Sequence, residues 1–306
     1  MMDIFKSNLV PGRLDLSIME AYRQTTNIPH LRQLFLSGWQ KQPEITALAL
    51  SSISGAVVTP AEDDAAMATI TDYFMEPYYL PSMSIAQADA YFTGLGRKMC
   101  LDYDEGLSFD DETPLIIETL HHQTTFSALY MLCRQLTLKN RYDRIILLRR
   151  RQDFDARLEV MQTLARRVFN TESELISVSA DDWLQCLLRS TKKRSVILCF
   201  GDIAPALFPQ YHRPSRTSST LRLYLSSGLS ESIEGFSIAA RLARTLRARH
   251  WVMDYPEPDR IRVAQSGDST KLHCSMAQWV FWPALSLFAI GRHIDPGDPT
   301  SALETA

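Results

Sequence analysis

The stretch Pro114-Leu-Ile-Ile-Glu-Thr-Leu-His-His-Gln-Thr-Thr-Phe126 joins a short apolar run to a helix-like segment through two adjacent histidines, His121 and His122. The run at residues 115–120 has the length and the apolar character of a buried strand. Proteins of the α/β class bind their ligands at the carboxyl ends of such strands. A histidine at this point is well placed to act as a general base.

The segments that follow repeat this pattern of strand and helix. Residues 124–138 predict a helix with apolar positions at helical spacing, and residues 144–148 (Arg-Ile-Ile-Leu-Leu) predict a strong strand. Later strands are predicted at 174–178 and 195–200, and later helices at 155–169 and 180–189. Alternation of this kind is typical of a parallel sheet with helices on its faces. The sequence therefore predicts an α/β fold with a mostly parallel central sheet flanked by helices.

The regions on either side of this alternation differ from it in their predicted secondary structure. Residues 1–100 predict a helical N-terminal region packed on the core, with helices at 16–25, 30–41, 62–74 and 84–95. Residues 101–292 form the predicted α/β domain, which continues with a linker at 204–220, a strand at 221–225, a helix at 233–247 and strands at 250–253 and 260–264. Residues 279–290 predict a buried or interfacial helix, and residues 293–306 a loose C-terminal tail.

The bulk composition limits the class of protein. The 306 residues carry a formal net charge of −3, with 45% hydrophobic and 22% charged residues, as expected for a folded soluble chain. This charge argues against a nucleic-acid partner. No apolar run has the length of an integral membrane segment, while peripheral membrane contact stays open. Five scattered cysteines without metal-ligand spacing, and an N-terminus without a secretory pattern, predict a cytoplasmic location.

The order and spacing of several segments resemble the lysophospholipid acyltransferase superfamily, in particular its bacterial lipid A late acyltransferase branch. There, an approach segment and a strand lead to a histidine motif, and a strand ending near an Asp is followed by a glycine-containing block and a last strand. The matching segments here are 101–107, 115–120, 121–126, 196–202, 232–243 and 248–253. The resemblance covers roughly residues 85–265. It lies in the order and spacing of these segments more than in the identity of their residues.

The resemblance implies a catalytic role for His121 or His122. In the family, the histidine deprotonates an acceptor that then attacks an acyl thioester, and a carboxylate five residues later orients the imidazole. Here that position holds Phe126, counted from the first histidine, or Ser127, counted from the second. The usual acid of the motif is therefore missing.

Two other carboxylates are candidates for the missing acid. Asp202 follows the strand predicted at 195–200 and can approach the histidines if the two strands lie close in the sheet. Glu118 lies on the same strand as the histidines, and strand alternation places it on the face of His122. Each candidate also has a simpler interpretation, with Asp202 as a turn residue, Glu118 as a structural strand residue, and the histidines as helix caps or packing groups.

Several arginines and one glycine are candidates for substrate binding. The arginines could bind the phosphates of an acyl donor or the acidic surface of a carrier protein, or simply form a solvated edge. The resemblance implies that the glycine allows the backbone to approach substrate or sheet; the alternative is that it only relieves packing. These candidates are Arg149, Arg150, Arg151, Arg213, Arg216 and Gly235.

The sequence thus predicts a soluble acyltransferase that moves an acyl group from a coenzyme A or acyl-carrier-protein thioester to a hydroxyl or amine. It would need no tightly bound cofactor and no metal. Its partners would be the acyl donor and a partner enzyme of lipid or secondary-metabolite biosynthesis. Two alternatives stay open: a catalytically inactive binding or scaffold subunit of a biosynthetic complex, and a thioester or ester hydrolase.

Overall fold

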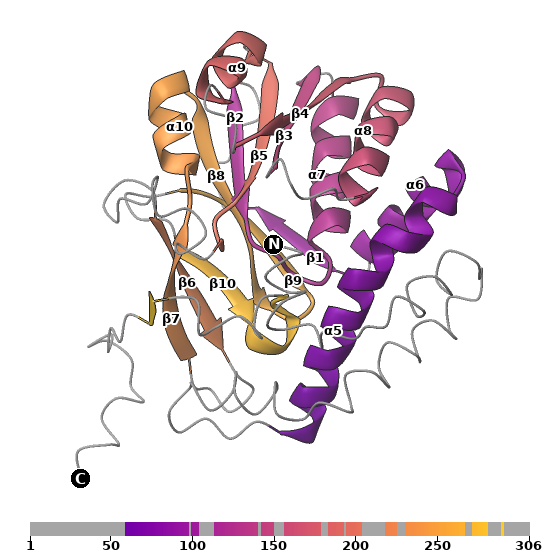
Figure 1. Ribbon diagram of the computed structural model, residues 1–306, viewed down its shortest axis with the longest axis vertical. Coiled ribbons are helices and arrows are strands. Elements are labelled where there is room, and N and C mark those ends of the chain that lie inside the picture. The colour runs from indigo at the N-terminus through magenta and orange to yellow at the C-terminus, as the bar shows by residue number, and fades with distance from the viewer. Residues whose placement is uncertain are drawn as a thin grey trace.

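A large, mostly parallel sheet forms the centre of the computed structural model (Figure 1). The structure describes residues 59–97, 99–103, 113–139, 142–149, 156–178, 183–192, 194–203, 218–224, 230–266, 271–280 and 289–290. The sheet has seven strands in the order β1-β9-β8-β2-β5-β3-β4. These are β1 (Cys100–Tyr103), β2 (Leu115–Thr119), β3 (Arg144–Arg149), β4 (Glu172–Ser177), β5 (Ser195–Phe200), β8 (Arg249–Glu257) and β9 (Arg260–Gln265). Every neighbouring pair is parallel except β8 with β9, so the predicted fold class is confirmed.

Strand β2 lies inside the sheet, between β5 and β8. All five of its residues are buried, which explains its unbroken apolar character, because helices cover both faces of a parallel sheet. The charged residue in this strand, Glu118, is as fully buried as its apolar neighbours. A buried carboxylate needs a partner, so the residue that pairs with Glu118 decides whether this carboxylate belongs to the candidate active site.

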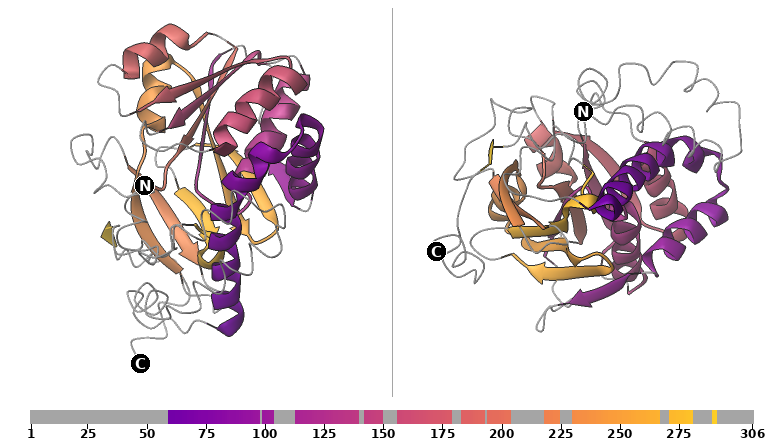
Figure 2. Two further views of the ribbon diagram at one scale, coloured as in Figure 1. Left: turned by 45° about the vertical axis from the view of Figure 1, so that its right-hand side comes forward. Right: turned by 90° about the horizontal axis from the view of Figure 1, so that it is seen from below.

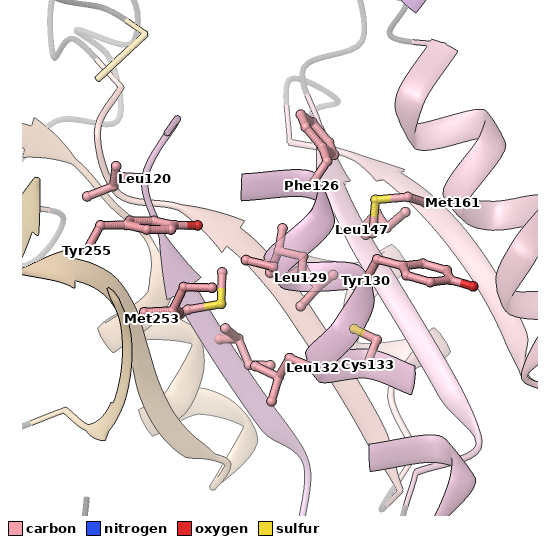
Figure 3. Packing of buried hydrophobic residues seen from close by; sticks show 14 of the residues in the cluster. Leu120, Phe126, Leu129, Tyr130, Leu132, Cys133, Leu147, Met161, Met253 and Tyr255 are labelled. Atoms are coloured by element: carbon pink, nitrogen blue, oxygen red, sulfur yellow. The ribbon is translucent and has the colours of Figure 1, made fainter. Parts of the chain in front are cut away.

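Helices cover the two faces of the large sheet (Figure 1). The helices α7 (Thr125–Leu138) and α8 (Ala156–Val168) pack on one face, and α9 (Trp183–Ser190) and α10 (Ala239–Leu246) pack on the other. Alternate residues of β2 join different clusters, with Ile117 in the first and Ile116 in the second. In Figure 3, Leu129 and Leu132 of α7 lie on the side toward Met253 of β8.

The helical N-terminal region is confirmed for its described part. Helix α5 (Pro60–Tyr79) begins at a capping box formed by Thr59 and Glu62, and α6 (Ile85–Gly96) begins at one formed by Ser84 and Gln87. Each box satisfies amide groups that the first helical turn leaves without partners. Between them lies the short 3₁₀ helix η2 (Leu80–Ser82). The helices predicted at 16–25 and 30–41 lie outside the described residues. Figure 2 shows α5 and α6 beside the helices that cover the large sheet.

A second, four-stranded sheet was not predicted from the sequence. It contains β10 (Lys271–Ser275), β6 (Ser218–Tyr224), β7 (Ser230–Phe236) and β11 (Ala289–Ile290), in that order. The helix predicted at 233–247 is therefore wrong in its first residues, because β7 pairs antiparallel with β6 along its whole length and buries Ile233. Only residues from Ala239 onward form α10. Pairing across the hairpin outweighs the local helical pattern.

The segment at 276–290 also differs from its prediction. It begins with a 3₁₀ helix, η4 (Met276–Gln278), and Trp279 then forms an isolated antiparallel bridge with His122. Residues 289–290 belong to β11. The single helix predicted at 279–290 is therefore wrong at both of its ends, because these ends pair with other strands and loops.

Candidate active site

Adjacent parallel strands bring His121 and Asp202 together at the carboxyl edge of the large sheet. In the register of β2 and β5, Thr119 lies opposite Phe200, and the Gly201 amide donates to the Thr119 carbonyl oxygen at 2.8 Å. The two strands therefore end at the same level, and the residues just beyond them meet. This is the edge at which α/β proteins bind their ligands.

Three hydrogen bonds hold the carboxylate of Asp202, which is fully buried. Its Oδ1 lies 2.7 Å from Nδ1 of the His121 ring. Its Oδ2 accepts from the His121 backbone N–H at 2.7 Å and from the indole N–H of Trp279 at 2.8 Å. Because a carboxylate only accepts, Nδ1 of the imidazole carries the proton. In the neutral ring, Nε2 then has the lone pair that a general base requires.

The His121 ring lies among aromatic side chains. It stacks on Phe200 with ring centroids 3.9 Å apart, and Tyr73 of α5 meets it edge-on at 6.3 Å. The residue is 6% exposed. On the Tyr73 ring lies the buried guanidinium of Arg157, whose Nη1 is 3.6 Å from the Glu76 carboxylate. A buried ion pair therefore lies one aromatic ring away from the candidate base.

His122 has a different environment from its neighbour. Its ring stacks on Tyr255 at 3.8 Å and is nearly parallel to it. The backbone N–H of His122 donates to the Thr125 hydroxyl at 2.7 Å, and Nδ1 accepts from the Thr124 backbone N–H at 3.1 Å. Burial lowers the pKa of His122 to about 3, and the Gln278 side chain opposes this shift only in part. His122 is therefore neutral near pH 7 and tied into the loop between β2 and α7.

Among the described residues, Glu118 forms no side-chain hydrogen bond with His121 or His122. Its Oε2 lies 2.8 Å from Nε2 of His250 on β8, while Oε1 is buried and has no hydrogen-bond partner among the described residues. Of the two candidate acids, the structure therefore brings Asp202 to His121 and pairs Glu118 with a histidine that the sequence did not single out.

A second carboxylate–histidine pair, Asp254 with His273, was also missed. Asp254 of β8 is fully buried, and its Oδ2 lies 2.7 Å from Nδ1 of His273 on β10. The His273 backbone N–H donates to the same oxygen at 3.0 Å, whereas the ring and the backbone N–H of His121 contact different oxygens of Asp202. The guanidinium of Arg262 donates to both carboxylate oxygens, at 3.0 and 2.7 Å. This pair links the two sheets, and no motif or spacing in the sequence signals it.

The candidates for substrate binding are only partly described. Arg149 ends β3 and forms an ion pair with Glu159 of α8 at 3.2 Å. Gly235 lies in β7 directly against the backbone of Gly201 and Asp202, where a Cβ atom would overlap the Gly201 carbonyl oxygen. The glycine therefore allows the second sheet to approach the strand end that carries the candidate acid. Arg150, Arg151, Arg213 and Arg216 lie outside the described residues.

The described residues contain no group of three or more histidine, cysteine, aspartate or glutamate side chains arranged to hold a metal ion. Among the helices in this part of the chain, none is long and apolar enough to cross a membrane. No known family model, curated protein or solved structure matches the chain. The function proposed below therefore rests on the geometry of the site and on the sequence resemblance.

Proposed function

We propose that the protein transfers an acyl group from a thioester of coenzyme A or acyl carrier protein to a hydroxyl or amine, with His121 as the general base. The observation that supports this most is the buried carboxylate of Asp202 at 2.7 Å from Nδ1 of His121. It supplies the acid that the histidine motif lacks in sequence. Asp202 orients the ring and favours the imidazolium that forms when Nε2 takes a proton.

The chemical step needs only a proton relay through His121. Nε2 removes the proton of the acceptor hydroxyl or amine as its oxygen or nitrogen attacks the thioester carbonyl carbon. The tetrahedral intermediate then collapses, the carbon–sulfur bond breaks, and Nε2 returns the proton to the departing thiolate. The products are the acylated acceptor and a free thiol, and the imidazole is restored.

A second candidate function is a binding or scaffold subunit without catalytic activity. It is favoured by the packing of both histidine rings, since His121 stacks on Phe200 and His122 stacks on Tyr255. In this role, Asp202 and Trp279 would only fix the loop that follows β2. Under either proposal the scattered cysteines support a cytoplasmic location.

The release of free thiol distinguishes these functions. Purified protein is incubated with acetyl, octanoyl and palmitoyl thioesters of coenzyme A and of acyl carrier protein, with and without a mixture of alcohols and amines. Acyl transfer predicts thiol release that depends on the acceptor and is lost in His121→Gln, while His273→Gln keeps it. Release without an acceptor indicates a hydrolase. No release from any donor, or full activity of His121→Gln, rejects the proposal.

A further inference from the structure

A cavity of about 760 Å³, wide open to solvent, lies at the amino-terminal ends of β3 and β4, where the last turns of α8 and α9 meet the sheet. His121 and Asp202 follow the carboxyl ends of their strands, so the cavity is at the opposite edge of the sheet. Its volume falls within the roughly 300–1,000 Å³ of small-molecule sites. The proposed acyl transfer gives this cavity no role.

The side chains that line the cavity are predominantly basic. Its cations are Arg144, Arg166, Arg189 and Lys192, and its carboxylates are Glu172 and Glu174. Four positive and two negative groups leave a formal charge of about +2 in the lining. An anionic ligand is therefore favoured at this position, although the whole chain carries a net charge of −3.

The carboxylates of the lining neutralise only part of this charge. Arg144 lies 3.2 Å from Glu172 and 3.7 Å from Glu174, and it also donates to the Ser190 carbonyl oxygen. Lys192 lies 3.9 Å from Glu172, and both of these side chains are mostly exposed. Arg144 is thus held in place by the two carboxylates, while Lys192 is bound only loosely.

Two arginines in the lining keep donors for a ligand. Among the described residues, the Arg189 side chain forms no hydrogen bond or ion pair, and the Arg166 side chain uses one N–H to donate to the Ser173 carbonyl oxygen at 3.3 Å. Both side chains are exposed. The Ser173 side chain is buried, and its hydroxyl has no hydrogen-bond partner in the described part of the chain. That hydroxyl oxygen is covered by protein atoms, so the two arginines, and not Ser173, are the groups open to a ligand.

Basic residues at the ends of helices often serve only to balance the helix dipole. Here the chain itself satisfies several of the terminal carbonyl groups. The Thr171 amide donates to the Ala165 carbonyl oxygen at 3.0 Å at the end of α8, and the Thr191 amide donates to that of Leu187 at 2.8 Å at the end of α9. These two carbonyl groups therefore do not depend on an arginine for a hydrogen bond.

We propose that this cavity binds a small molecule that carries phosphate groups. Guanidinium groups match phosphate oxygens through paired N–H donors, which Arg166 and Arg189 supply. Glu172 and Glu174 stand beside them and accept from the hydroxyl or amino groups of such a ligand. The site is independent of the His121 chemistry.

Isothermal titration calorimetry with inorganic pyrophosphate and with ATP, both without divalent cations, tests the proposal on the full chain. At least one probe should bind with a Kd below about 1 mM, and Arg189→Ala should weaken it at least about tenfold, the effect of one hydrogen-bonded charged group. Equal affinities for the two probes indicate a site for phosphate alone, and tighter binding of ATP indicates that the nucleoside also contributes.

Two control variants show whether the loss of affinity is specific to the cavity. Arg241→Ala removes an exposed arginine from α10, away from the cavity, and should leave the Kd unchanged. His121→Gln should also leave it unchanged, whether or not the proposed acyl transfer is correct. The proposal is overturned if neither probe binds below about 1 mM, or if Arg189→Ala and Arg241→Ala have the same effect.

Discussion

Acid should destabilise this protein through His122 in particular. Burial lowers the pKa of His122 to about 3 in the folded protein, whereas a histidine in an unfolded chain titrates near about 6.5. Between these values the unfolded state binds a proton at this position and the folded state does not. Stability is therefore complete above about pH 6.5 and falls as the pH drops toward 3. The loss is about 1.4 kcal/mol at about pH 5.5 and about 2.7 kcal/mol at about pH 4.5.

The assay is urea denaturation of the wild type and of His122→Asn between about pH 7.5 and about pH 4.5. The asparagine oxygen can still accept from the Thr124 amide, but the side chain does not titrate. The variant should be less stable near neutral pH, because it loses the ring that stacks on Tyr255. This gap in the free energy of unfolding should shrink by about 2.7 kcal/mol at the acid end. Parallel pH profiles, within about 0.5 kcal/mol, would show that protonation of His122 does not cause the loss of stability in acid.

Two further predictions concern a close backbone contact and a buried ion pair. Gly235→Ala should lower the free energy of unfolding by at least about 2 kcal/mol, because the new Cβ overlaps the Gly201 carbonyl oxygen; Gly94→Ala, with open space around its Cβ, should raise it by about 0.5–1 kcal/mol. Arg157→Met should cost about 3–5 kcal/mol by removing a buried cation beside Glu76, and adding Glu76→Gln should recover more than half of it. Urea denaturation measures these free energies of unfolding. The first prediction is contradicted if Gly235→Ala is as stable as Gly94→Ala, and the second if the double variant recovers none of the lost stability.

The central part of the fold could be predicted because its strands are buried on both faces. Strands β2, β3 and β5 contain continuous apolar runs, which are typical of strands covered on both faces. The helices between them have apolar residues at helical spacing. The second sheet was missed for the opposite reason. Its strands β7 and β10 mix polar and apolar residues and derive their stability from pairing with β6, which local sequence does not reveal.

For the candidate active site, the sequence predicts which residues follow the ends of strands, but not which of these residues meet. Both His121 and Asp202 follow recognisable strands, so each was a candidate. Their contact depends on β5 lying next to β2, although β3 and β4 come between them in the chain. The pairs of Glu118 with His250 and of Asp254 with His273 depend on the position of β8 in the same way. Such neighbours follow from the order of strands in the sheet, not from sequence spacing.

The rate of acceptor-dependent thiol release by Asp202→Asn, compared with that of the wild type, tests directly whether Asp202 holds His121 as a general base. Both proteins are compared at equal folded fraction, as determined by urea denaturation. We expect the substitution to lower kcat by about 10²–10⁴, the range that general base catalysis contributes. A wild type without acyl transfer, or a variant with an unchanged kcat, would contradict this role of Asp202.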